Sequence, residues 1–112
     1  MIDDYSFGQI VIDGHKYTDD VIIYPGRVDD SWWREEGHRL KVADIETIIE
    51  ADPEVLVVGT GAYGRVAIEP AVKQRLEDRG IELLSAPTEE ACKKYNDICD
   101  DKKVVAALHL TC

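Results

Sequence analysis

The sequence has few of the features that mark secreted, membrane or disordered proteins. No apolar run approaches the ~20 residues of a spanning helix, and the opening MIDDYSFG has neither the basic nor the apolar part of a secretory signal. Cys92, Cys99 and Cys112 form no C-x-x-C pair, so we expect reduced thiols and no disulfide framework. With 45% apolar and 32% charged residues, the composition is typical of a folded chain. We therefore predict a cytoplasmic globular protein.

Basic residues are also scarce relative to acidic ones. Thirteen Lys and Arg face 23 Asp and Glu, which gives a formal net charge of −10 at pH 7. A charge of this sign repels nucleic-acid phosphates and anionic membrane surfaces. Nucleic acid and membrane partners are therefore not expected. At 112 residues the chain fits a single domain, residues 1–112, with one core.

Turn signals divide the first part of the chain into strands. An Asp-Gly pair between β-rich flanks predicts a hairpin over about residues 5–18. The apolar run over residues 20–25 ends at Pro-Gly and predicts a third strand, buried on both faces. Residues 26–41 have neither helical nor strand periodicity, so we expect an ordered loop there.

Helical and strand periodicities alternate from residue 42 onward. Apolar spacings of three and four residues, Pro70 as a first helical residue and Gly80 as a C-terminal cap predict helices, with Thr88 as an N-cap. The predicted helices cover residues 42–53, 70–80 and 88–99, and the predicted strands cover 54–59, 81–85 and 104–110. Right-handed crossovers make these strands parallel. The fold prediction is α/β with a mixed sheet, in which an N-terminal β-hairpin precedes an αβαβαβ series.

The segment VLVVGTGAYGRV contains G-x-G-x-x-G, the pattern of a dinucleotide-binding loop. Such a loop needs its third glycine in the first helical turn and an acidic residue about 20 positions further on. Here the helix signal starts at Pro70, well after Gly64, and the acidic position falls on neutral residues. The K-[ST] of a phosphate loop is replaced by Arg65 and Val66. We therefore predict no nucleotide cofactor.

Two interpretations of this loop stay open. Backbone N–H groups over Gly59, Thr60 and Gly61, at the carboxyl end of a parallel strand, can hold a small anion. Alternatively, the glycines only allow the strand to turn tightly.

The segment WWREEGH is the second candidate site. In an extended backbone, Trp32 and Trp33 cannot both point into a core, so one of them is expected to line a cleft or interface. Arg34 and His38 lie in the same loop. No complete catalytic or metal-ligating set accompanies them, because Glu35-x-x-His38 contains a glycine and has no second copy. We predict no catalytic residues and no metal site.

The chain contains, in order, the segments YSFGQIVIDGHKY, WWREEGH, LVVGTGAYG, KYN and VVAALHLTC. In this combination it resembles a family of small α/β proteins of unknown function found in archaea and bacteria. Its animal relatives include the adipogenesis-associated domain proteins and a mitochondrial complex I assembly factor. The resemblance covers nearly the whole chain and suggests a prokaryotic, archaeal member. The family-like positions are Trp33, Arg34, Gly37, His38, Gly59, Thr60, Gly61, Thr88, Tyr95 and Asn96.

This resemblance implies a three-layer α/β fold with a mixed central sheet and no established catalytic activity. Two function hypotheses follow. In the first, the chain is a protein-binding or assembly module that uses the tryptophan loop, together with sheet or helix surface, to contact a partner or a second copy. In the second, the chain is a small-molecule binding protein or an enzyme, in which the amides of Gly59 to Gly61 hold a small anionic ligand while Arg34 and His38 approach it. The second requires the two loops to converge on one pocket.

Overall fold

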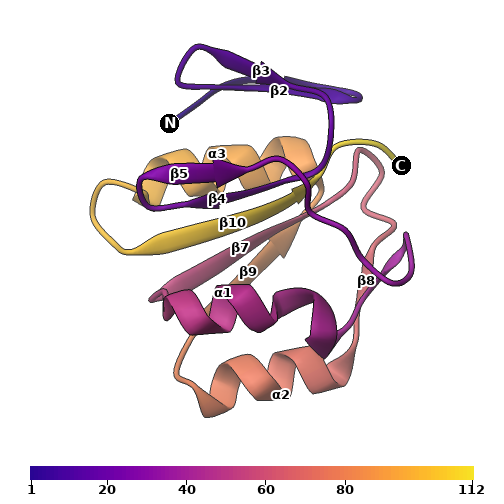
Figure 1. Cartoon of the computed structure of the whole chain (residues 1–112), viewed down its shortest axis with the longest axis vertical. Helices are drawn as coiled ribbons and strands as arrows, with labels where there is room; N and C mark the ends of the chain where they lie inside the picture. Colours follow the sequence, from indigo (N-terminus) through magenta and orange to yellow (C-terminus); the bar gives the residue numbers. More distant parts are fainter.

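A five-stranded mixed sheet forms the centre of the fold in a computed structural model that describes residues 1–112 (Figure 1). Its strand order is β5-β4-β10-β7-β9. The central strand β10 pairs in parallel with β7 and antiparallel with β4. The five strands are β4 (Val21–Tyr24), β5 (Arg27–Asp29), β7 (Val55–Thr60), β9 (Glu82–Ala86) and β10 (Val104–His109).

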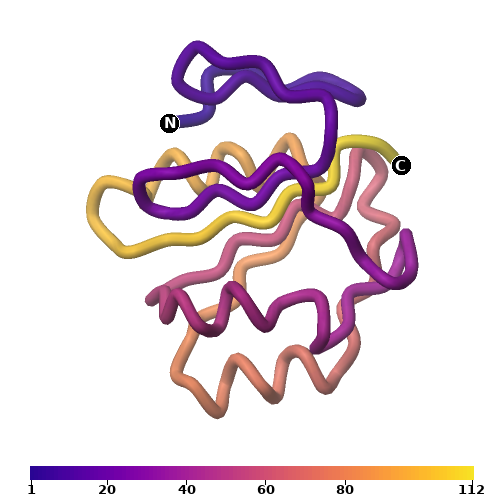
Figure 2. The backbone as a smooth tube through the Cα atoms, viewed as in Figure 1, coloured from indigo at the N-terminus to yellow at the C-terminus, as the bar shows by residue number.

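Both faces of this sheet are covered, which gives three layers (Figures 1 and 2). One face carries helices α1 (Glu46–Ala51) and α2 (Pro70–Asp78), with the short 3-10 helix η1 (Val42–Ile45) before α1. The other face carries α3 (Thr88–Ile98) and a separate three-stranded sheet. No helix combines the length and apolarity needed to cross a membrane.

The three-stranded sheet is built from two tight turns near the N-terminus. Its antiparallel strands are β1 (Ile2–Ser6), β2 (Gln9–Ile12) and β3 (His15–Tyr17). The turn between β2 and β3 is the predicted Asp-Gly pair, with positive φ at both residues. A second turn, with Gly8 at φ +80°, adds β1, so the predicted hairpin is in fact three strands.

Successive side chains of the central strands point to opposite faces of the sheet, and this divides the core into two halves. In β7 and β10, Val57 and Ala106 pack toward α3, whereas Leu56 and Val105 pack toward α1 and α2. All six residues of each strand are buried. This explains why the parallel strands read as continuous apolar runs in the sequence.

The structure confirms the predicted mixed α/β fold and corrects three details. Residues 26–41 are not only loop, because they contain β5 and a two-residue strand, β6 (Arg39–Leu40), which pairs with β8 (Ala67–Ile68). Thr88 does not cap α3, since Pro87 occupies the N-cap position and the Thr88 hydroxyl bonds elsewhere. The predicted helix over 42–53 is shorter, with η1 forming its first turn.

The side chain of Asn96 fastens β1 to α3. Its Oδ1 accepts a hydrogen bond from the backbone N–H of Ile2 (2.9 Å), and its Nδ2 donates to the carbonyl of the same residue (2.8 Å). The hydroxyl of Tyr5 donates to the Leu110 carbonyl (2.9 Å), which ties the same strand to the end of β10. Polar bonds therefore fix where the small sheet docks on the apolar core.

We expect Asn96→Ala to lower the free energy of unfolding by about 1–3 kcal/mol, because both backbone groups of Ile2 lose a partner. Amide exchange along β1 should accelerate more than exchange in β7. Asp97→Ala, a neighbouring exposed position on α3, is the control and should change stability by less than about 0.5 kcal/mol. Equal effects of the two substitutions would contradict this role of Asn96.

Candidate functional site

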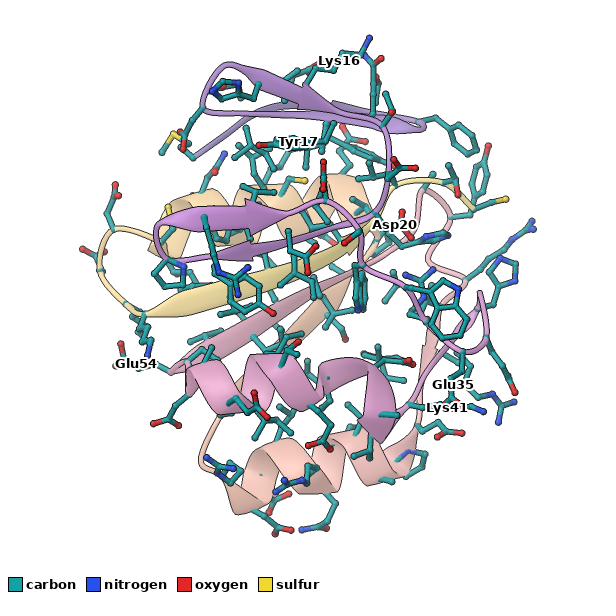
Figure 3. The ribbon with its side chains drawn as sticks, in the orientation of Figure 1. Lys16, Tyr17, Asp20, Glu35, Lys41 and Glu54 are labelled. Atoms are coloured by element: carbon teal, nitrogen blue, oxygen red, sulfur yellow. The ribbon has the colours of Figure 1, made fainter.

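The buried polar residues cluster at the ends of β7 and β10. Because β4 runs antiparallel to β10, its first residues lie at the same end of the sheet as the last residues of β10. Asp20 precedes β4, His109 ends β10 and Thr60 ends β7. Figure 3 shows Asp20 near this end, close to the segment that leads to the C-terminus. Sheet topology thus assembles residues that are 89 positions apart in sequence.

The partly buried Asp20 forms a hydrogen-bonded network with the buried Arg34 and His109. Asp20 Oδ2 lies 2.7 Å from His109 Nδ1 and accepts a bond from Arg34 Nη1 at 3.0 Å. Asp20 Oδ1 accepts the backbone N–H of Leu110 at 2.8 Å. Arg34 Nη2 donates to the Gly37 carbonyl at 3.0 Å and lies 3.0 Å from His109 Nδ1. One carboxylate therefore joins three segments of the chain.

We place the His109 ring proton on Nδ1, because an ionised carboxylate can only accept a hydrogen bond and Asp20 lies closest to this nitrogen. Burial by itself opposes ionisation of Asp20. The hydrogen bonds from His109, the Leu110 N–H and Arg34 outweigh that cost, so the pKa of Asp20 lies below its usual value. The carboxylate is accordingly charged at neutral pH and neutralises Arg34.

The same network fixes the conformation of the tryptophan loop. The Arg34 guanidinium lies 4.7 Å from the centre of the Trp32 ring, and Trp32 Nε1 donates to the Asp44 carbonyl. The Asp44 carboxylate accepts the backbone N–H groups of Glu35 (3.2 Å) and Lys41 (2.9 Å). Trp32 is therefore buried and both ends of the loop are anchored.

Trp33 takes the opposite orientation to Trp32, as the sequence pattern predicts for one of the pair. Its side chain is 75% exposed, the highest value of any large apolar residue. It borders a shallow hollow of about 450 Å³. The hollow is lined by Thr18, Asp19, Asp20, Asp30, Ser31, Trp32, Trp33 and Thr111.

The glycine loop lies beside the network but has little freedom to bind a ligand. The N–H of Gly61 donates to Thr88 Oγ1 (2.9 Å), and that hydroxyl donates to the His109 carbonyl (2.6 Å). The N–H of Ala62 donates to the Thr111 carbonyl (2.8 Å). The prediction that amides of Gly59 to Gly61 hold an anion is therefore not supported at Gly61, whose donor is occupied within the chain.

Close packing explains the glycines instead. A Cβ on Gly61, which has φ +101°, would lie 2.9 Å from the Thr111 carbonyl oxygen and 3.0 Å from the His109 ring. A Cβ on Gly59 would lie 2.8 Å from Leu108 and 2.9 Å from the Thr88 hydroxyl. Thr60 Oγ1 donates to the Ala86 carbonyl (3.0 Å). These residues hold β7, α3 and β10 together where the strands end.

The structure brings several predicted site residues together. Arg34, Thr60 and Gly61 lie around the same strand ends. The exposed His38 ring lies 6.3 Å from the His109 ring, centre to centre, in an edge-on arrangement. Cys92, which is not a predicted site residue, is buried on α3, where burial raises the pKa of its thiol to about 12. No three His, Cys, Asp or Glu side chains group as metal ligands would.

Sequence reasoning missed Asp20 and His109 as partners. The one available signal is that His109 is polar within a continuous apolar strand, where a buried histidine needs a partner. Nothing near residue 20 in the sequence indicates that this carboxylate is the partner. Two nitrogens of the network, Arg34 Nε and His109 Nε2, are buried without a hydrogen-bond partner.

Comparison with known proteins gives matches over almost the whole chain. Residues 2–109 match the family described as "Protein of unknown function (DUF498/DUF598)". A conserved hypothetical protein from Pyrococcus horikoshii is 32% identical, with a TM-score of 0.86, and the match covers 100% of this chain and 99% of that one.

Two bacterial structures share the fold at lower identity. A Mth938-like domain protein of Bordetella pertussis is 22% identical with a TM-score of 0.72, over 98% of this chain and 85% of that one. A Xanthomonas campestris protein is 18% identical with a TM-score of 0.85, over 98% and 83%. The resemblance drawn from the sequence motifs is confirmed at the level of the family and of its three-layer α/β fold.

We expect Thr88→Val to lower the free energy of unfolding by about 2–4 kcal/mol, because the buried Gly61 N–H and His109 carbonyl both lose a partner. Thr88→Ser keeps the hydroxyl and removes one methyl group, so its loss should be only about 1 kcal/mol. Denaturant unfolding of the two variants measures the difference. Similar losses for valine and serine would show that the hydroxyl bridge contributes little.

Asp20→Asn should lower stability on the order of 3 kcal/mol at pH 7, because it leaves Arg34 buried without its counter-charge. Since folding lowers the pKa of Asp20, the stabilisation is complete above the unfolded value of about 3.9 and is lost as pH falls through the folded pKa. The difference between wild type and variant should therefore shrink below about pH 4. Asp19→Asn, at an exposed position, is the control, and a pH-independent Asp20 effect would contradict the ionic role.

Proposed function

This chain belongs to the protein family of unknown function DUF498/DUF598, and we propose that it is a protein-binding module that receives a basic segment of a partner protein. The binding surface is the hollow lined by the eight residues given above, and we call it the Trp33 hollow. Within it, Trp33 and the carboxylates of Asp19 and Asp30 make the proposed contacts.

The observation that carries this proposal is the pairing of an exposed tryptophan with a rigid loop. A tryptophan held in place before binding loses little conformational freedom on association, and such residues are enriched among the energetically dominant positions of interfaces. Trp33 follows the buried Trp32 and precedes the buried Arg34. Its neighbours on both sides are thus anchored in the core, so the backbone that carries the ring is held in place.

The charges around Trp33 favour a cationic ligand. Asp19 and Asp30 are exposed, make no salt bridge and line the same hollow. A Lys or Arg side chain over the indole face gains a cation–π contact and pairs with these carboxylates. The net charge of −10 steers basic partners toward the protein. A small anion would instead meet uncompensated carboxylates, because Asp20 already neutralises Arg34.

The other exposed aromatic residues at this end, Phe7 and Tyr63, already contact other side chains. Tyr63 has its ring centre 6.3 Å from that of Phe7, and the Arg65 guanidinium lies 5.4 Å from the Tyr63 ring. Trp33 takes part in no aromatic pair and has no cation over its ring. It is therefore the aromatic residue that is open to a partner.

A second candidate function, a small-molecule site, is favoured by one observation. The unpartnered Arg34 Nε and His109 Nε2 are polar atoms that a ligand acceptor or donor would satisfy. A thermal-shift scan with phosphate, sulfate, ATP, NAD and coenzyme A tests this candidate, since a ligand that prefers the native state raises the melting temperature. We rank it second because the adjacent Gly61 and Ala62 amides are occupied.

We expect a fluorescein-labelled arginine-rich decapeptide to bind the protein, and Trp33→Ala to weaken that binding at least about 30-fold, the effect of removing an interface hot spot. Replacing both Asp19 and Asp30 by Asn should weaken binding several-fold and reduce its dependence on salt. Fluorescence anisotropy at low and high ionic strength measures both effects.

Tyr63→Ala is the matched control, since Tyr63 is also an exposed aromatic (67%) but does not line the Trp33 hollow. It should bind the peptide like the wild type. An acidic decapeptide of equal length should not bind. Unchanged binding by Trp33→Ala, or equal binding of the acidic peptide, would refute the proposal.

A further inference from the structure

The two edges of the central sheet are protected to different degrees. Strand β5 at one edge has three residues and carries a charge at each end, Arg27 and Asp29. Strand β9 at the other edge has five residues, and its only charge is Glu82 at its start. Proteins usually guard an open edge with charges, proline or a short strand. The middle of β9 has none of these.

The backbone groups that β9 leaves free can be identified from its bonds. The N–H of Glu82 donates to the Glu54 carbonyl (3.0 Å), and the Ala86 carbonyl accepts the Thr60 hydroxyl (3.0 Å). Both residues therefore turn their backbone groups toward β7. Because these groups alternate along a strand, Leu84 also faces β7, whereas Leu83 and Ser85 face outward. The free edge thus offers two N–H and two C=O groups.

This set of groups is complementary to itself. When two β9 strands run antiparallel about a two-fold axis at Leu84, Leu83 of each copy lies opposite Ser85 of the other. Such a pair exchanges both of its hydrogen bonds, so the two symmetric pairs satisfy every free group of the edge. We propose that β9 is the self-association surface of this protein and joins two copies into a continuous ten-stranded sheet.

The side chains fit the same register. Leu84, only partly buried on the α3 face, lies opposite Leu84 of the second copy and is covered by it. Glu82 lies opposite Ala86, so no two carboxylates face each other. Pro87 follows Ala86 and has no N–H, which ends the ladder after four bonds.

The groove beside β9 supplies the charge complementarity that selects a second copy as the occupant. This groove, about 610 Å³ between α2 and β9, is lined by Lys73 and Glu77, one helical turn apart, together with Leu83 and Ser85. The two-fold axis brings Lys73 of one copy toward Glu77 of the other, and the reverse. A surface with both charges in this order is complementary to its own rotated image. The β9 edge lies apart from the Trp33 hollow, since the two share no lining residue.

The test compares Ser85→Pro with Ser85→Ala, two variants that both lack the hydroxyl and differ in the backbone N–H. Proline removes an outward-facing donor and leaves the β7 ladder intact. Sedimentation equilibrium should give a dimer for wild type and Ser85→Ala. The protein concentration should span roughly 5–200 μM, the range in which dimers of modest affinity dissociate. Ser85→Pro should shift the dissociation constant at least about 30-fold toward monomer, the effect of losing two symmetric donors.

Leu84→Lys is a second variant that does not depend on the proline being tolerated. It places two ammonium groups opposite each other in the dimer and should also give monomer, with the far-UV circular dichroism of the wild type. In the wild type, amide exchange at Leu83 and Ser85 should slow as protein concentration rises, while exchange in β5 should not. A monomeric wild type at every concentration, or a dimer unaffected by Leu84→Lys, would overturn the proposal, as would concentration-dependent protection confined to another element.

Discussion

The partly buried carboxylate of Asp20 is the constraint on which the structure at the ends of β7 and β10 depends. It accepts bonds from Arg34, His109 and the backbone of Leu110, and so links the start of β4, the tryptophan loop and the end of β10. Taking an arginine out of water is costly unless a paired charge compensates it. Asp20 compensates the charge of Arg34. It also connects three parts of the chain, because its hydrogen-bond partners come from the tryptophan loop and from the end of β10. Between β5 and β6, the conformation of the tryptophan loop is held by this charge pair together with the contacts to Asp44.

Packing inside the protein at the ends of β7 and β10 determines which side chains are exposed there. Trp32 fills the core beneath Arg34, so the next residue along the loop, Trp33, has to point into solvent. Gly61 and Thr88 close the neighbouring strand ends with hydrogen bonds and close contacts. Loops held on a stable scaffold are frequent carriers of binding function. In the proposed function, these polar contacts position the residues of the Trp33 hollow.

Two separate surfaces give the proposed module a simple mode of action. The Trp33 hollow presents an aromatic ring with carboxylates, which suits a basic partner, whereas β9 presents backbone groups that suit its own copy. Two-fold pairing along β9 would display two hollows on one assembly. Binding of two linked sites strengthens association through effective concentration, without new contacts at either site. This would allow a modest single-site affinity to support a stable complex.

Local patterns in the sequence determined the α/β fold, the Asp-Gly turn, the order of helices and strands and the exposure of one tryptophan of the pair. These features depend on neighbours a few residues apart, and the period of two or 3.6 residues records them locally. Only tertiary structure decided that Asp20 meets His109, that Thr88 bridges two strands instead of capping its helix, and that the Gly61 amide is occupied. Those contacts join residues 21 to 89 positions apart, and they arise where β7 and β10 end together. No local pattern encodes which polar group a sheet will place beside another, because that depends on strand order and crossover direction, which are set by packing of the whole chain.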